Sequence, residues 1–266
     1  REYLFADSCG TGGDGSGTIN VSTAVAFVVA AAGLPVAKHG NRSVTSRCGS
    51  AGVLVHLGVG LDVPAQTSRL ALDEIGICFL FAPAYHPGLK HAGPVRRALK
   101  VRTIMNVLGP CVNPAEPPVQ LLGVADPARL HAIARTLDAM GVEQALIVHG
   151  SGLDEVALHD RTVAVRLDRG RIEDLILVPE DVGLHRAPLE TAVGGDAEED
   201  AGPLRLLLAG AGTKAEQDIV ALNPGALLMT AGKAASLREG FGQARDALQS
   251  GEAGKVLNAY VEASHG

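Results

Sequence analysis

The sequence predicts an α/β protein with a central, mostly parallel mixed sheet flanked by helices. Strand-like and helix-like segments alternate through residues 1–150, and this alternation is typical of a parallel sheet. A hairpin signal at Asp168-Arg169-Gly170 adds antiparallel strands. The 266 residues, 47% of them hydrophobic, are enough to bury a sizeable core. We expect a single domain over residues 1–266.

The predicted elements follow in order along the chain. Residues 3–9 form a short strand that leads into a glycine-rich loop. Residues 22–33 form a helix that is apolar on nearly every side, is therefore buried, and ends at Gly33. Ser50 and Asp126 are expected to cap later helices, and Ser236 begins a helix that ends near residue 250. The other expected strands are 34–40, 77–83, 119–125, 144–150 and the hairpin 162–178, and the other expected helices are 49–58, 87–99, 127–140 and most of the remainder.

Composition and charge exclude several classes of protein. The net charge is −6 and aromatic residues make up 3%, so a surface for nucleic acid is not expected. No apolar run reaches the roughly 18 residues of a membrane span, and there is no signal peptide, so we expect a cytoplasmic protein without a membrane partner. No two of the four cysteines form a C-x-x-C pair, which argues against zinc and favours reduced thiols.

The glycine-rich loop, residues 10–15, is the first segment that indicates chemistry. Four glycines in six residues between a strand and a helix favour a cradle for a phosphate over an ordinary tight turn. The same glycines match G-x-G-x-x-G, but residues 35–42 are basic where a dinucleotide site needs an acidic ribose partner. Asn20, Ser22 and Thr23 can cap the following helix, or can bind phosphate oxygens or a metal.

Three later segments carry further polar groups. Residues 38–50 combine Lys38, Arg42 and Arg47 with hydroxyl side chains, which favours an oligophosphate site over a solvated loop. His86 and His91 are expected to be ordinary surface or core histidines, whereas Arg96 or Arg97 could hold a carboxylate. Adjacent carboxylates such as Asp154 and Glu155 are usually exposed charges, but beside a polyphosphate site this pair becomes a candidate for binding Mg²⁺.

Together these segments resemble the anthranilate phosphoribosyltransferase family. The resemblance rests on "GTGGDG", "NVST", "KHGNRSVTS", "FLFAPAYHPGLKHAGPVRRAL", "RTIMNVLGPCVNP" and "GLDEVALH", in that order and over nearly the whole chain. It implies transfer of phosphoribose from 5-phosphoribosyl 1-pyrophosphate (PRPP) to the amino group of anthranilate, a step in tryptophan biosynthesis. It also implies that Mg²⁺ is the cofactor.

The resemblance further implies a role for individual residues. Mg²⁺ would be held by Ser22, Asp154 and Glu155, and anthranilate would lie near Gly10, Asn41 and Arg96. The residues that would contact PRPP are Gly10, Gly13, Asp14, Thr18, Asn20, Val21, Ser22, Thr23, Lys38, His39, Gly40, Asn41, Arg42, Ser43, Val44, Thr45, Ser46 and Ser50.

The chain departs from the family pattern in two places. The family carries a small N-terminal helical domain before the glycine loop, which we expect to be largely missing from this sequence. Gly52 stands where the family usually has aspartate. The resemblance implies a homodimer in the full-length protein, with possible association with, or fusion to, the glutaminase subunit of anthranilate synthase.

Two alternative functions stay open on the sequence alone. A pyrimidine-nucleoside phosphorylase would have a similar fold and glycine loop. It binds only inorganic phosphate and a nucleoside, so it has less need of an Asp-Glu pair that binds Mg²⁺. A non-catalytic relative that binds nucleic acid is disfavoured by the charge of −6. The dinucleotide oxidoreductase is the weakest alternative, because the acidic ribose partner is missing.

Overall fold

A seven-stranded sheet forms the centre of the computed structural model, which describes residues 3–42, 49–91, 98 and 103–266. The strand order is β3-β2-β1-β4-β5-β6-β7. The five strands β3, β2, β1, β4 and β5 run parallel to their neighbours. Strand β6 is antiparallel to β5, and β7 is antiparallel to β6. This confirms the mixed sheet that the sequence predicts. The strands are β1 (Ala6–Gly10), β2 (Val36–Gly40), β3 (Ile77–Phe81), β4 (Val119–Gly123), β5 (Gln144–His149), β6 (Thr162–Asp168) and β7 (Arg171–Leu177).

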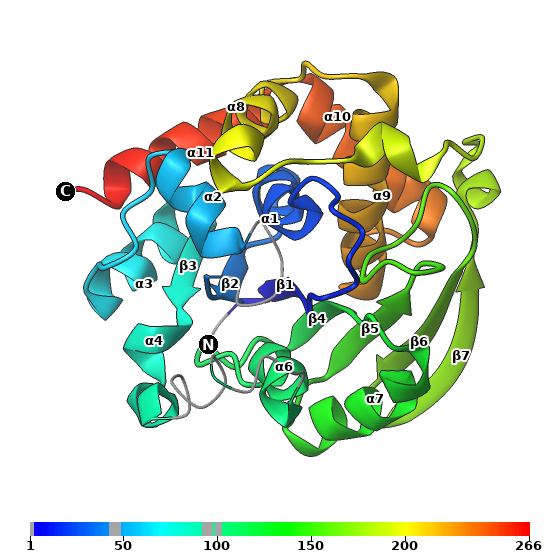
Figure 1. Ribbon diagram of the computed structural model, residues 1–266, viewed down its shortest axis with the longest axis horizontal. Coiled ribbons are helices and arrows are strands. Elements are labelled where there is room, and N and C mark those ends of the chain that lie inside the picture. The colour runs from blue at the N-terminus through cyan, green and yellow to red at the C-terminus, as the bar shows by residue number, and fades with distance from the viewer. Residues whose placement is uncertain (1–2, 43–48, 92–97, 99–102) are drawn as a thin grey trace.

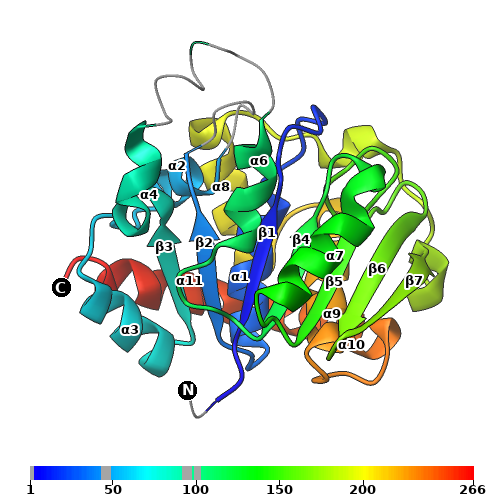
Figure 2. The same cartoon turned by 90° about the horizontal axis from the view of Figure 1, so that it is seen from below.

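Helices cover both faces of this sheet (Figures 1 and 2). One face carries α1, α9, α10 and α11, and the other carries α6 and α7. The helices are α1 (Val21–Ala31), α2 (Ser50–His56), α3 (Ala65–Glu74), α4 (Ala82–Tyr85), α6 (Ile104–Leu108), α7 (Leu130–Ala139), α8 (Ala197–Leu208), α9 (Lys214–Thr230), α10 (Leu237–Gln249) and α11 (Glu252–Ala263). Short 3₁₀ turns are η1 (Pro87–His91), η2 (Gly109–Cys111), η3 (Pro127–Arg129), η4 (Pro179–Val182) and η5 (Leu189–Ala192).

The order of the strands reverses at β1, and this reversal positions the site. The chain runs from β1 outward through β2 and β3, and then returns to place β4 on the other side of β1. Loops that leave β1 and β4 therefore diverge and open a crevice at the carboxyl ends of the strands, where α/β sheets bind ligands. Figure 2 shows the glycine loop (blue) at the upper end of β1, on this edge of the sheet.

Local signals for turns and caps are confirmed in several places. Arg169 and Gly170 have φ values of 47° and 85°, as a two-residue hairpin turn requires. Gly33 follows α1 with a φ of 84°, as expected for a helix end. The Asp126 side chain accepts the Ala128 N–H at 3.1 Å, and the Ser236 hydroxyl accepts the Glu239 N–H at 3.2 Å.

Other expectations differ from the structure. Ser50 is the first residue of α2 and Gly49 is its N-cap, without a side-chain hydrogen bond, so the predicted cap is wrong. Over residues 87–91, the predicted helix 87–99 is instead a 3₁₀ turn. Residue 98 is helical, and residues 92–97 and 99 lie outside the described residues. The sequence analysis missed α3, whose weak apolar pattern buries only three residues. Residues 179–196 are turns and irregular chain before α8 begins, not helix.

Within the described residues, no helix combines the length and the apolar character needed to cross a membrane. Cys9, Cys78 and Cys111, the cysteines among the described residues, form no disulfide bond there.

Candidate active site

A cleft of about 1000 Å³ opens at the carboxyl ends of β1 and β2. It is lined by every described residue that the sequence analysis assigned to PRPP, anthranilate or metal, with the exception of Thr23. The Thr23 side chain is instead buried within α1. Arg96 and residues 43–46 lie outside the described residues.

The glycine loop lines one side of the cleft in a left-handed backbone conformation. Gly12, Gly13, Gly15 and Gly17 have φ values between 63° and 77°. A side chain would meet nothing within 4 Å at Gly12, Gly15 or Gly17, so glycine is needed there for backbone conformation and not for space. The Asp14 carboxylate closes the loop by accepting the Ser16 N–H and hydroxyl at 3.2 and 2.8 Å. Such loops turn successive N–H groups toward one anion.

Two glycines at the ends of neighbouring strands bring the acidic pair against this loop. A Cβ on Gly10 would collide with Oδ2 of Asp154, and a Cβ on Gly123 would collide with the Asp154 carbonyl oxygen. The Gly12 N–H donates to Oδ2 of Asp154 at 2.7 Å. The role of Gly123 was not found in the sequence, because only the pairing of β1 with β4 places it beside Gly10.

Burial governs the charge of the acidic pair. Burial, and then the nearby Asp14 carboxylate, raises the pKa of Asp154 to about 7. Burial raises the pKa of Glu155 well above its usual value, and Asp154 adds to the shift. Lys38 and a backbone hydrogen bond from Ser22 act in the opposite direction on Glu155. These carboxylates therefore lie where a further cation would stabilise their charged forms.

Lys38 connects the glycine-loop strand to the start of α1. Its Nζ donates to the Ser8 carbonyl oxygen at 2.6 Å and to Oγ of Ser22 at 3.3 Å. The side chain is buried, which lowers the pKa of Lys38, while Asp7 is the largest of the opposing influences. Ser22 is thus adjacent to both Lys38 and Glu155.

A buried carboxyl group lies beneath the cleft, and sequence reasoning missed it. Asp7 accepts the backbone N–H of His39 at 3.2 Å and the side-chain amide of Asn113 at 2.8 Å. Burial raises the pKa of Asp7 to about 6, and Lys38 opposes this rise. The available signal was a charged residue inside an otherwise apolar strand, since such a residue is buried only with partners.

The second side of the cleft is histidine-rich and apolar. The rings of His39 and His86 meet edge to face with centroids 5.1 Å apart, and each Nε2 is buried without a hydrogen-bond partner among the described residues. Burial, and then His86, lowers the pKa of His39 to about 4, so its ring is neutral at pH 7. The apolar residues on this side are Met105, Leu108, Pro110 and Val112.

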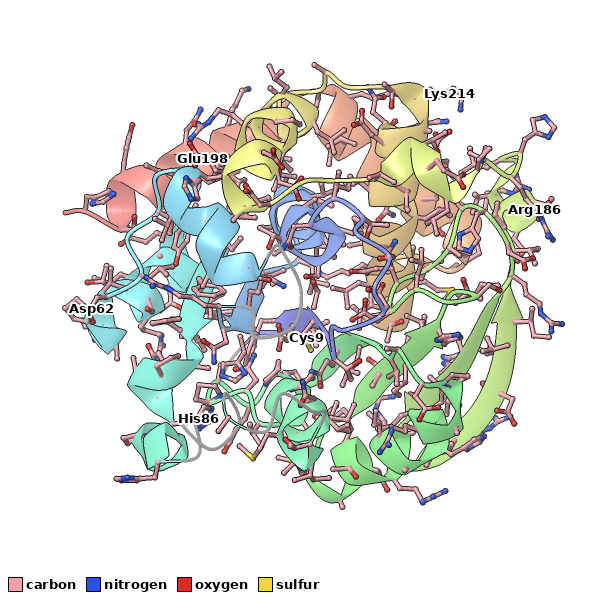
Figure 3. All side chains as sticks on the ribbon, in the orientation of Figure 1. Cys9, Asp62, His86, Arg186, Glu198 and Lys214 are labelled. Carbon is pink, nitrogen blue, oxygen red and sulfur yellow. The ribbon has the colours of Figure 1, made fainter. Side chains whose placement is uncertain are left out.

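Figure 3 shows two cleft residues, Cys9 near the centre of the view and His86 toward its lower left. Asp62, Arg186 and Lys214 lie at its periphery in the same view. The described residues contain no group of three or more His, Cys, Asp or Glu side chains that could hold a metal by themselves.

The remaining predicted residues have local structural partners as well. The Asn20 side chain caps α1 by accepting the Thr23 N–H at 3.1 Å. Asn41 accepts the Arg42 N–H at 2.7 Å at the end of β2. Gly52 lies against α8, where a Cβ would meet the Cβ of Ala197 at 3.0 Å. A larger residue at Gly52 would thus require α8 to shift.

Comparison with known proteins identifies the class to which this fold and cleft belong. The family model described as "Glycosyl transferase family, a/b domain" matches residues 2–254, so the chain belongs to this glycosyl transferase family. Its relatives specify the branch. The anthranilate phosphoribosyltransferase of Sorangium cellulosum is 59% identical over 262 residues, which cover 98% of this chain and 75% of that relative. The chain is therefore a member of the anthranilate phosphoribosyltransferase family.

Solved structures agree with this placement. The anthranilate phosphoribosyltransferase of Thermus thermophilus superposes with a TM-score of 0.93 at 45% identity, covering 100% of this chain and 79% of that one. The enzyme from Saccharomyces cerevisiae in complex with PRPP and Mg superposes with a TM-score of 0.89 at 28% identity, covering 98% and 74%.

Proposed function

We propose that this chain transfers phosphoribose from PRPP to the amino group of anthranilate, giving N-(5-phosphoribosyl)anthranilate and pyrophosphate in tryptophan biosynthesis. The observation that carries this proposal is the pairing of two unlike halves in one cleft. One half has the glycine loop, Lys38 and buried carboxylates, and the other half is apolar and histidine-lined. A polyphosphate sugar suits the first half, and an aromatic amine suits the second.

The phosphate half supports departure of pyrophosphate. Displacement at the anomeric carbon develops positive charge on the ribose and negative charge on the leaving group. The glycine-loop amides and the Lys38 ammonium lie along the same cleft and can stabilise that negative charge. Of the proposed PRPP contacts, Gly10, Gly13, Asp14, Lys38 and Ser50 are among the described residues that line this cleft.

The donor set at the acidic pair suits Mg²⁺. Ser22, Asp154 and Glu155 offer only oxygen atoms, and Mg²⁺ prefers one or two carboxylates together with phosphate oxygens. The buried Glu155 has Lys38 as the cation that lowers its pKa, while two carboxylates raise it. We propose that these three residues hold Mg²⁺, which, when bound, neutralises charge on the pyrophosphate.

The acceptor half places the nucleophile. The aromatic amine of anthranilate is neutral, so placement matters more than a strong base. His39 is neutral at pH 7 and is the candidate for accepting the amine proton. We propose that Gly10, Asn41 and Arg96 hold anthranilate, with the Arg96 guanidinium on its carboxylate. Arg96→Ala should then raise the anthranilate KM more than the PRPP KM; the reverse would move the acceptor site elsewhere.

A direct assay tests the proposed reaction. Loss of anthranilate fluorescence should require both PRPP and Mg²⁺. The same preparation should not cleave thymidine in the presence of inorganic phosphate. Phosphorolysis of thymidine without consumption of PRPP would overturn the proposal in favour of a nucleoside phosphorylase.

The assembly and the cellular setting are proposals as well. The chain spans about three quarters of the length of the Sorangium relative. We propose that residues 1–266 form one domain, that the full-length protein is a cytoplasmic homodimer, and that it associates with an anthranilate synthase glutaminase subunit. Light scattering on the full-length protein, alone and with that subunit, tests the dimer and the association.

A further inference from the structure

Three buried polar side chains beneath the cleft have no role in the proposed reaction. Asp7 on β1 is 0% exposed, Gln120 on β4 is 2% exposed, and Asn113, just after η2, is 8% exposed. Buried polar groups are retained only where hydrogen bonds compensate for lost water. Their partners therefore show what these side chains hold in place.

Asn113 fastens the chain after η2 to two strands. Its Nδ2 donates to Oδ2 of Asp7 and to the Ala37 carbonyl oxygen, both at 2.8 Å. Its Oδ1 accepts the Ala115 N–H, also at 2.8 Å. One side chain thus connects this segment to β1 through Asp7 and to β2 through Ala37.

Gln120 fastens the same turn from its other side. Its Nε2 donates to the Pro110 carbonyl oxygen at 2.6 Å and to the Cys9 sulfur at 3.1 Å. The turn between these anchors, residues 109–112, supplies Gly109, Pro110 and Val112 to the apolar side of the cleft. We call residues 109–112 the acceptor wall. Its position is set by side chains that lie outside the cleft.

Asp7 joins the acceptor wall to the phosphate half. One carboxylate oxygen accepts the Asn113 amide, and the other accepts the backbone N–H of His39, which follows Lys38 on β2. We propose that Asp7 and Asn113 are positioning residues that set the spacing between the acceptor wall and the Lys38–His39 end of β2. This proposal rests on the proposed transfer reaction, because that spacing determines how closely the amine approaches the anomeric carbon.

The reaction is sensitive to this spacing. Bond formation requires the reacting atoms to approach within about 3–3.5 Å, and a misplacement of about 1 Å can lower the rate about 100-fold. Asn113 directly follows the acceptor wall in the chain, and its Nδ2 reaches Asp7 on β1 and the Ala37 carbonyl oxygen on β2. Asp7 reaches Asn113 and the His39 N–H beside Lys38. Without Asn113 the wall loses its anchor while Asp7 still holds His39, so acceptor use should be impaired; a change at Asp7 disturbs both of its contacts, so acceptor and PRPP should be impaired together.

Asn113→Ala and Asp7→Asn test this difference in the full-length enzyme. We expect Asn113→Ala to lower kcat/KM for anthranilate about 100-fold, while the Kd of PRPP with Mg²⁺, measured by calorimetry, does not change. Asp7→Asn should lower kcat/KM for anthranilate and also weaken PRPP binding. Equal losses for both substrates in Asn113→Ala would overturn the proposal.

An exchange variant separates positioning from simple loss of packing. In Asp7→Asn alone two amide groups face each other, and in Asn113→Asp alone two carboxylates do. The double exchange restores a donor opposite an acceptor between positions 7 and 113, although an aspartate at 113 cannot donate to the Ala37 carbonyl oxygen. Its kcat/KM for anthranilate should therefore exceed that of Asn113→Asp, the single variant with the same loss at Ala37. A double variant no better than Asn113→Asp would contradict the proposal.

Tyr260→Phe provides the matched control. The Tyr260 hydroxyl is buried and accepts the Phe79 N–H of β3 at 2.7 Å, so its loss also breaks a buried bond to a strand. This variant should lower Tm and leave kcat/KM for both substrates unchanged. If the wild type transfers phosphoribose and Asn113→Ala behaves like Tyr260→Phe, the positioning role is wrong and the proposed function stands. If the wild type does not transfer phosphoribose, the proposed function itself fails.

Discussion

The two ends of the sheet carry the same kinds of charged side chain in opposite surroundings. At the parallel end, Asp7 and Lys38 are buried beneath the cleft, 0% and 2% exposed. At the antiparallel end, Arg166, Asp168, Arg171 and Glu173 form ion pairs of 2.9–3.7 Å on partly exposed strands. Burial raises the pKa of Asp7 and lowers the pKa of Lys38.

This difference indicates what each set of charges is for. Exposed ion pairs contribute roughly 0–1 kcal/mol to stability. Buried carboxylates cost stability because burial disfavours their charged form. Asp154 and Glu155 line the cleft, where desolvation raises the pKa of each, so their charged forms cost the fold stability. That cost is consistent with a ligand that completes their surroundings, and mutations can test it at both ends of the sheet.

The largest effect is expected from neutralising the buried pair. Asp154→Asn with Glu155→Gln should lower turnover about 1000-fold, because charge stabilisation at the leaving group is lost. The metal-free variant should be at least as stable as the wild type, since the buried charges are gone. Steady-state kinetics in a magnesium titration and thermal melts measure the two effects. Unchanged dependence on magnesium would refute the assignment of these ligands.

The next effect is the contribution of His39 to the pH dependence of the free energy of unfolding. Its pKa is about 4 in the folded protein and about 6.5 when unfolded. As the pH falls from 6.5 to 4, the unfolded chain takes up a proton that folded His39 does not, so stability is lost over this interval. His86 and Lys38, which also face His39, keep its pKa low.

His39→Gln removes this contribution. Between pH 7 and pH 4, the free energy of unfolding should fall by about 3 kcal/mol less in the variant than in the wild type, at about 1.4 kcal/mol per pKa unit. Denaturant titrations at each pH measure this difference. Parallel stability curves for the two proteins would show that His39 takes up a proton in the folded state as readily as in the unfolded state.

A smaller effect on turnover should distinguish Gly10, where a side chain would collide with a neighbour, from Gly202, where it would not. Gly10→Ala places a methyl group against Oδ2 of Asp154, too close for both, so the acidic pair must move. We expect turnover to fall about tenfold to thirtyfold, as for a shift of less than 1 Å. Gly202→Ala, inside α8, meets nothing within 4 Å and should leave turnover intact while raising helix stability slightly. Equal kinetics in both variants would remove Gly10 from the site.

The smallest effect is expected at the antiparallel end. Asp168→Asn with Glu173→Gln makes the same chemical changes as in Asp154 and Glu155, but on partly exposed side chains that are already paired with arginines. Stability should change by less than about 1 kcal/mol and turnover should not change. A loss of turnover in this variant would show that the charges at the antiparallel end of the sheet influence the cleft.

Local patterns in the sequence were sufficient for much of the fold and for one half of the site. The alternation of strands and helices, the Arg169-Gly170 turn and the Asp126 and Ser236 caps depend on residues close together in the chain, so they could be predicted. The glycine loop and its basic neighbour Lys38 are local for the same reason. The Ser50 cap and α3 were predicted wrongly or missed, because their local signals are weak and packing decides them.

By itself, then, the sequence determined that a glycine-rich loop follows the first strand of a mixed α/β sheet, and which family the chain resembles. Only the tertiary structure decided which distant residues meet. The pairing of β1 with β4 brings Gly10 and Gly123 against Asp154, and the return of the chain after η2 brings Asn113 to Asp7. These contacts join residues far apart in the chain, so no periodicity or spacing encodes them. They exist because the strand order reverses at β1.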